Sequence, residues 1–128
     1  MKPNQPHPAI SEAEWKVLRV LWDKSPQPAY DIIQRLAQTE DWRASTVKTL
    51  LARLYRKKVL GIRRYKNLFL YFPLVSEEAC LQSESESFLE RFFDGSVKTL
   101  LVHFVHREKL TRKDIDELRK VLEQGEKP

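Results

Sequence analysis

The chain has 128 residues, 41% of them hydrophobic, and a net charge of +5, which suits one ordinary globular domain or two very small ones. Its single cysteine, Cys80, excludes an internal disulfide and a cysteine-rich metal site. No apolar run approaches the roughly 20 residues of a membrane span, and the first ten residues lack the apolar core of a signal peptide, so we expect a soluble cytoplasmic protein.

Two helices are predicted near the N-terminus. Ser11 and Glu14 have the spacing of a capping box, which opens a first helix that ends at the proline-rich residues 25–28. A second helix covers about 29–38. Its apolar side chains are expected to face inward: Tyr30, Ile33, Leu36 and Ala37.

A third helix and a hairpin follow. The helix runs from about 45 to 58, and its apolar stripe consists of Val47, Leu50, Leu51, Leu54 and Tyr55. After Gly61, residues 62–66 and 69–72 are β-prone and Pro73 ends the second strand. Helix, short helix, helix and hairpin is the order of a winged helix-turn-helix.

The remaining chain is predicted to form three more helices, at about 77–93, 97–107 and 111–125. Thr111 and Asp114 have capping-box spacing at the start of the last one. We therefore predict a mainly α protein, with a winged-helix DNA-binding domain at 1–74 followed by a helical dimerisation domain at 75–128.

Charge is distributed unevenly along the sequence. Residues 1–74 hold 14 Lys and Arg against 6 Asp and Glu, whereas residues 75–128 hold 9 against 12. The stretch 42–76 contains no acidic residue, and all nine of its bases lie between 43 and 66. A surface of one sign built on folded elements predicts a polyanionic partner, of which nucleic acid is the first candidate.

The start of the third helix has the strongest functional pattern. Small polar or basic groups lie off its apolar stripe, as expected of a recognition helix in a DNA major groove. We predict DNA contacts for Arg43, Ser45, Lys48 and Thr49, and phosphate contact for Arg53 at the far end of the same helix. The alternative is an ordinary solvated helix face.

The hairpin carries three further bases, Arg63, Arg64 and Lys66. A cationic wing can reach a minor groove or flanking phosphates. The alternative is charge that protects an edge strand from pairing. Residues 56–58 are weaker phosphate candidates, since bases at a helix end also complement its dipole.

The C-terminal helices carry more apolar side chains than three short helices can bury among themselves. Burial against a second copy would cover them, and a two-fold dimer suits a palindromic DNA site. The alternative is packing onto the N-terminal domain. The side chains predicted at the dimer interface are Phe88, Phe92, Phe93, Leu100, Leu101, Phe104 and Val105.

Catalytic or cofactor chemistry has little support. His103 and His106 have helical spacing for two metal ligands, but no third ligand is evident. Cys80 is interpreted as a buried, inert thiol rather than a redox site. We expect no enzyme activity, metal, cofactor or small-molecule ligand.

Several phrases resemble the BlaI/MecI family of penicillinase repressors, which also includes copper-responsive CopY-type members. They are Ile10-Ser-Glu-Ala-Glu-Trp-Lys-Val-Leu-Arg-Val-Leu-Trp22, Trp42-Arg-Ala-Ser-Thr-Val-Lys-Thr-Leu-Leu-Ala-Arg-Leu54, Phe93-Asp-Gly95 and Asp116-Glu-Leu118. The resemblance covers roughly 10–124. It implies a dimeric winged-helix repressor on pseudo-palindromic operators with TACA and TGTA elements. The matching recognition positions are Ser45, Thr46, Lys48 and Thr49.

In the β-lactam branch, the resemblance implies induction by proteolysis within the dimer domain, with a membrane metalloprotease sensor as partner. The matching bond is His103–Phe104, where the family pattern has Asn before Phe. The sequence lacks the Cys-x-Cys pairs of the copper-responsive relatives, which argues against a copper mechanism. We predict a dimeric repressor that occupies a promoter operator. The alternatives are a non-sequence-specific nucleic-acid binder and a protein–protein adaptor.

Overall fold

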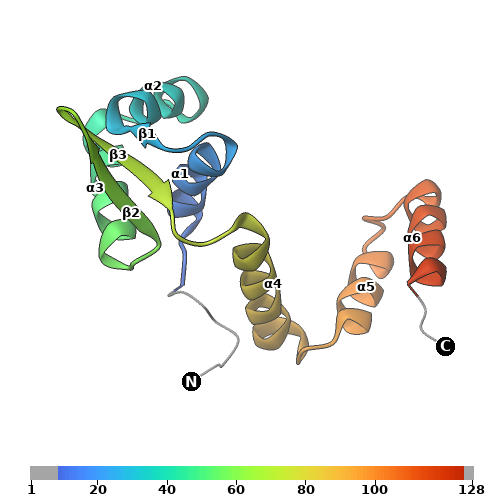
Figure 1. Ribbon diagram of the computed structural model, residues 1–128. Coiled ribbons are helices and arrows are strands. Elements are labelled where there is room, and N and C mark those ends of the chain that lie inside the picture. Colours follow the sequence, from blue (N-terminus) through green and yellow to red (C-terminus); the bar gives the residue numbers. More distant parts are fainter. Residues whose placement is uncertain (1–8, 126–128) are drawn as a thin grey trace. The chain divides into compact units, whose positions relative to one another are not determined.

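The computed structural model describes residues 9–125, which form six α-helices and three short β-strands (Figure 1). Contacts divide the chain after Glu84 into an N-terminal unit and a C-terminal unit. In chain order the elements are α1 (Glu12–Asp23), β1 (Gln27–Pro28), α2 (Ala29–Glu40), α3 (Ala44–Arg56), β2 (Leu60–Tyr65), β3 (Leu68–Pro73), α4 (Glu77–Phe93), α5 (Val97–His106) and α6 (Arg112–Gln124).

The N-terminal unit has the winged-helix arrangement predicted from the sequence, with α3 beside the β2–β3 hairpin (Figure 1). The capping box of α1 is confirmed. The Glu14 amide donates to Ser11 Oγ at 3.1 Å, and the Ser11 amide donates to Glu14 Oε1 at 2.8 Å. These two bonds satisfy amides that the first helical turn leaves without partners.

The sheet is antiparallel, in the order β1-β3-β2. Tyr65 pairs with Leu68, so a two-residue turn closes the hairpin. β2 starts at Leu60, two residues earlier than expected. β1 was not predicted, because a two-residue strand is defined by its pairing with β3, at Gln27 opposite Tyr71, rather than by its own pattern.

A core of twelve buried apolar side chains lies between the three helices and the sheet. They are Val17, Leu18, Val20, Leu21, Ile32, Leu36, Val47, Leu50, Leu51, Leu54, Val59 and Leu60.

The predicted inward orientation of three side chains is wrong. Tyr30 is 66% exposed, because it lies two residues before buried Ile32 and therefore almost opposite it on α2. Tyr55 is 51% exposed, because it lies about 90° from the middle of the buried stripe of α3. Ala37 is likewise exposed.

The first turns of α4 belong to the N-terminal unit. Cys80 and Ser83 are buried there, and the Trp22 indole donates to the Val75 carbonyl at 3.0 Å. The unit therefore extends ten residues past position 74. The sequence predicted that residues up to 74 bind DNA and that residues from 75 onward form the dimer. This division of roles stays a prediction.

The C-terminal unit comprises the rest of α4 with α5 and α6. Positive φ angles at Asp94 (51°) and Gly95 (77°) turn the chain between α4 and α5. Thr111 and Asp114 form the expected capping box of α6. None of the residues from 85 to 125 is buried. Across the described part of the chain, the helices are too short or too polar to cross a bilayer.

Candidate nucleic-acid interface

The outer face of α3 carries most of the residues predicted to contact DNA. Val47, Leu50, Leu51 and Leu54 are buried. With 100° per residue, the stripe opposite them contains Ser45, Thr49, Ala52 and Arg56, all exposed. Thr46 and Arg53 lie on one flank of that stripe and Lys48 on the other. The predicted residues of α3 thus share one solvent-facing surface.

The side chains at the start of this surface are small. Thr49 Oγ1 donates to the Ser45 carbonyl at 2.9 Å, so its hydroxyl proton is used within the helix. A shallow depression lies beside them, lined by Ala13 of α1 together with Ser45, Thr46, Thr49, Leu50 and Arg53. A helix surface without bulky groups near its N-terminus can approach base edges closely.

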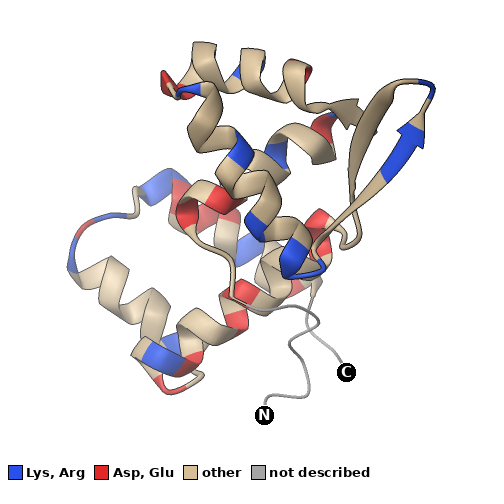
Figure 2. Cartoon of the chain, turned by 90° about the vertical axis from the view of Figure 1, so that its left-hand side faces the viewer, with Lys and Arg blue, Asp and Glu red and all other residues tan. Residues whose placement is uncertain are grey.

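The electrostatics of this face are positive. α3 has no acidic residue in its first turn, and its N-cap, Arg43, makes no side-chain cap. No acidic side chain in the first turn therefore offsets the positive end of the α3 helix dipole. Figure 2 shows basic residues along α3 and on the hairpin, and neither element contains Asp or Glu.

Lys57, one of the weaker phosphate candidates, is held by partners within the N-terminal unit. Its Nζ lies 2.6 Å from Glu14 Oε1 and also donates to the Ala9 carbonyl at 2.9 Å. Glu14 is fully buried. Burial raises the pKa of Glu14, but the hydrogen bonds from Lys57 and Ser11 and the Lys57 charge outweigh this, so the pKa is lowered. The pair joins the end of α3 to the start of α1. The sequence did not indicate it, because 43 residues separate the partners.

The three predicted wing bases, Arg63, Arg64 and Lys66, are all exposed. The Arg64 Nε donates to the Lys66 carbonyl at 3.3 Å. The Arg63 guanidinium lies 5.9 Å from the centre of the Phe72 ring, and the Lys66 Nζ lies 5.4 Å from that of Tyr65. The exposed apolar groups beside these bases, Tyr65, Leu68 and Phe69, were not predicted from the sequence. β-Propensity predicts a strand but does not predict that both of its faces are solvated.

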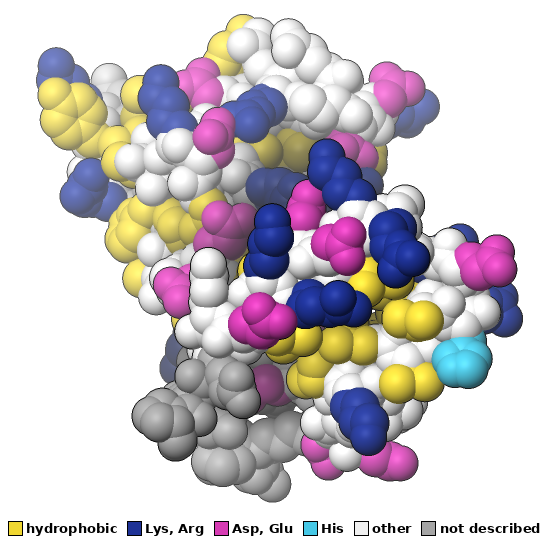
Figure 3. Space-filling model, turned by 90° about the vertical axis from the view of Figure 1, so that its right-hand side faces the viewer, with side chains coloured by type: hydrophobic (Ala, Val, Ile, Leu, Met, Phe, Trp, Pro, Cys, Tyr) yellow, Lys and Arg dark blue, Asp and Glu magenta, His cyan; other side chains and the backbone are white. Residues whose placement is uncertain are grey.

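The predicted dimer residues lie on a largely solvent-exposed apolar surface of the C-terminal unit. Phe88, Phe92, Phe104 and Val105 are exposed, and Phe93, Leu100 and Leu101 are half-buried. Figure 3 shows hydrophobic side chains gathered there among charged ones. Further exposed apolar side chains were not among the predicted ones: Val97, Val102, Val121 and Leu122.

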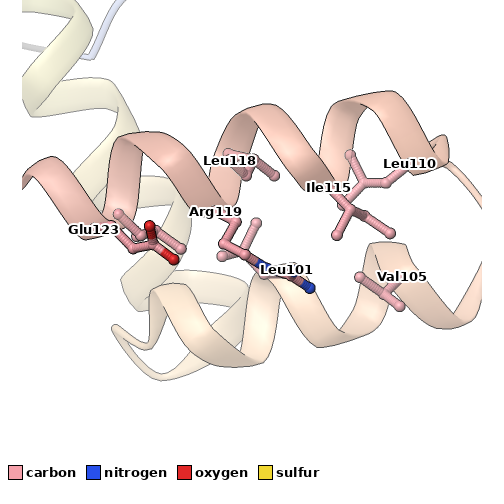
Figure 4. Close-up of a pocket in the computed structure, with 8 residues that line it drawn as sticks. Leu101, Val105, Leu110, Ile115, Leu118, Arg119 and Glu123 are labelled. Carbon is pink, nitrogen blue, oxygen red and sulfur yellow. The ribbon is translucent and has the colours of Figure 1, made fainter.

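An apolar groove runs between α5 and α6 (Figure 4). Leu101 and Val105 of α5 face Ile115 and Leu118 of α6, and Arg119 and Glu123 stand at its edge. A second hollow shares Leu101, Val105 and Leu122 with the first. The two hollows therefore belong to one continuous apolar surface.

The remaining candidates do not form a reactive site. His103 and Phe104 lie within α5, with their rings 5.2 Å apart, and the His103 ring is 5.7 Å from that of Phe93. No group of three potential metal ligands occurs between residues 9 and 125. Cys80 is buried, and burial together with the charge of Glu84 raises the pKa of its thiol to about 11. The thiol is thus protonated at neutral pH.

Residues 10–124 match the family described as penicillinase repressor. The methicillin resistance regulatory protein MecI of Staphylococcus aureus (strain N315) is 34% identical over 113 residues, 88% of this chain and 92% of MecI. The penicillinase repressor of Bacillus licheniformis is 32% identical over 117 residues, 91% of each chain. The solution structure of Bacillus licheniformis BlaI, in monomeric form with the blaP half-operator, is 33% identical with a TM-score of 0.52, over 56% of this chain and 88% of that one.

Proposed function

Because the chain belongs to the penicillinase repressor family, we propose that it is a cytoplasmic DNA-binding repressor that occupies a pseudo-palindromic operator in a promoter. In this proposal α3 enters the major groove through Ser45, Thr46, Lys48 and Thr49. Arg43 and Arg53 contact phosphate, and the hairpin bases lie along the adjacent groove. The observation that carries the proposal is the acid-free outer face of α3 beside an acid-free hairpin.

The DNA partner has support from a relative. Bacillus licheniformis BlaI was solved in monomeric form with a half-operator, and 88% of that structure aligns with 56% of this chain. A half-operator corresponds to one protomer. We therefore infer that two copies of this chain, related by a two-fold axis, occupy two half-sites.

The apolar surface of the C-terminal unit supports this homodimer. None of the residues 85–125 is buried in the single chain, although α4, α5 and α6 present many large apolar side chains. A monomer would keep this surface in water, and a second copy would remove it. The predicted contacts are Phe88, Phe92, Phe93, Leu100, Leu101, Phe104 and Val105.

Relief of repression is proposed to follow cleavage of the His103–Phe104 bond after a cell-wall antibiotic or similar signal, with a membrane metalloprotease sensor as the upstream partner. This bond lies inside α5, so a protease needs that helix to unwind locally. Because α5 has no buried residue, such opening breaks little packing. Cleavage would separate α6 from most of the apolar surface and so weaken the dimer.

The proposal is tested with the full chain and a duplex that it selects from a random-sequence pool. At physiological salt, the selected duplex should bind at least about 1000-fold more tightly than random duplex, and affinity should fall steeply with salt. Lys48→Ala should weaken binding by about 1–3 kcal/mol if Lys48 contacts a base. Lys113→Ala, on α6, is the matched control and should have no effect.

Equal affinity for selected and random duplexes would favour a non-sequence-specific nucleic-acid-binding protein, which the basic surface alone would also support. Absence of any salt-dependent DNA binding would favour the other alternative, a protein–protein adaptor. Sedimentation provides the other test, because the repressor proposal requires a dimer at micromolar concentration.

A further inference from the structure

We propose that the tip of the β2–β3 hairpin is an apolar wedge that contacts the sugar walls of the DNA minor groove beside the α3 site. The flexibility of the flanking base steps would then set part of the sequence preference. This inference rests on the proposed function, and it concerns side chains that a purely cationic wing would not need.

Large apolar side chains occupy both faces of the hairpin tip. Tyr65 and Leu68 are directly paired and so lie on the same face, and they are 57% and 51% exposed. Phe69 lies on the other face and is 59% exposed. Nearer the core the same strands are covered, since Tyr71 packs against the core and Phe72 lies over Gly61. The most exposed apolar groups of the hairpin therefore lie at its projecting end, while Ile62, nearer the core, is 37% exposed.

The positive charge of the hairpin tip indicates which kind of partner it would bind. Arg63, Arg64 and Lys66 stand beside the apolar groups, and no acidic residue occurs from 42 to 76. A partner protein surface or a lipid could cover apolar groups, but three cations without any anion favour a dense array of phosphates. DNA offers phosphates at the groove edge and apolar deoxyribose faces within the groove.

The tip is also held in a defined conformation. Lys66 has a positive φ of 56° in the two-residue turn, and its carbonyl accepts the hydrogen bond from Arg64. The Lys66 ammonium lies over the Tyr65 ring. A preformed tip loses less conformational entropy on binding than a mobile one.

Groove dimensions determine what such a tip would recognise. The minor groove of B-DNA is only about 6 Å wide, which is too narrow for a hairpin with large side chains on both faces. Entry therefore requires widening or partial unstacking. Pyrimidine–purine steps such as TA deform easily, whereas A-tracts are stiff and narrow. The wedge should thus prefer operators flanked by flexible steps.

The test uses the full chain and two duplexes that share the selected sequence but differ in the flank facing the hairpin, TA steps in one and an A-tract in the other. Wild type should bind the TA-flanked duplex about tenfold more tightly. Tyr65→Thr and Leu68→Thr retain β-propensity but remove the apolar bulk, so they should abolish this preference. The slope of affinity against salt should stay unchanged, since no cation is lost.

Leu81→Thr, at a similarly exposed leucine on α4, is the control and should retain the flank preference. With wild-type protein, 2-aminopurine placed in the TA flank should gain fluorescence on binding as the step unstacks. The inference is overturned if the threonine variants keep the wild-type flank preference, or if wild type shows neither preference nor fluorescence gain. Failure of wild type to distinguish selected from random duplex would instead overturn the proposed function.

Discussion

The two units of this chain use apolar residues in opposite ways. The N-terminal unit places twelve of them in an interior closed by three helices and a sheet. The C-terminal unit, of similar helical character, buries none of its residues between 85 and 125. Amphipathic helices are thus not sufficient to make a core. In the N-terminal unit three helices and a sheet close around the apolar faces, whereas the helices of the C-terminal unit leave theirs open to solvent.

Substitutions in the interior of the N-terminal unit should cost the most stability. Leu51→Ala should reduce the free energy of unfolding by about 2–5 kcal/mol, because Leu51 is fully buried and its truncation leaves a cavity. Urea denaturation should show this loss at every protein concentration. A loss that vanished at high concentration would contradict the view that this unit has a core of its own.

The C-terminal unit should behave in the opposite manner. Phe92→Ala removes a side chain that is 60% exposed in the single chain, where its ring contacts Phe88 and Arg91, so the proposed dimer interface should account for most of its effect on association. The dimer dissociation constant should rise by about 10- to 100-fold. Sedimentation equilibrium measures it, with Leu81→Ala as the control of equal exposure. An unchanged dissociation constant would place the interface elsewhere.

The ion pair between Glu14 and Lys57 should give the N-terminal unit a specific acid sensitivity. Because folding lowers the pKa of Glu14 below 4.5, its stabilisation is fully present above that pH and is lost as the pH falls through the folded-state value. Lys57→Met should destabilise by about 1–3 kcal/mol at pH 7, less than for a fully buried pair because Lys57 is partly exposed.

Urea denaturation of wild type and Lys57→Met across pH 3–7 checks this. The two stability curves should converge at the acid end, where Glu14 is protonated in both proteins. A constant difference between them would mean that Lys57 acts through packing and not through its charge.

The smallest effect is expected on the surface of the same unit. Arg35 and Asp23 lie 2.6 Å apart, but both side chains are exposed. Arg35→Ala should change the free energy of unfolding by less than about 1 kcal/mol, and salt should reduce even that. A larger loss would show that the stability of the N-terminal unit depends on more than its interior.

Local patterns allowed much of the fold to be predicted. The capping boxes at Ser11 and Thr111 and the stripe of α3 depend on residues within one or two turns, so spacing suffices to identify them. What the sequence could not show depends on distant partners. β1 exists only through β3, and Lys57 is held by a carboxylate 43 positions away.

The candidate interface likewise contains residues that could be predicted from the sequence and residues that could not. Bases and small polar residues on α3 could be identified from charge and period, because both are properties of consecutive residues. The exposure of Tyr65, Leu68 and Phe69 could not be predicted, since β-prone apolar residues usually pack against other parts of a protein. Whether a strand projects beyond its core is a property of the assembled sheet.

Gly61 has a consequence for protein engineering. A Cβ at this position would lie 2.5 Å from the Phe72 ring, so any side chain there would force that ring to move. Beyond this close contact, the strands reach the turn without further buried residues. We therefore expect that residues 62–69 can be replaced as one segment if Gly61 and Phe72 are kept, whereas Leu70 should stay because it pairs with Pro28 of β1.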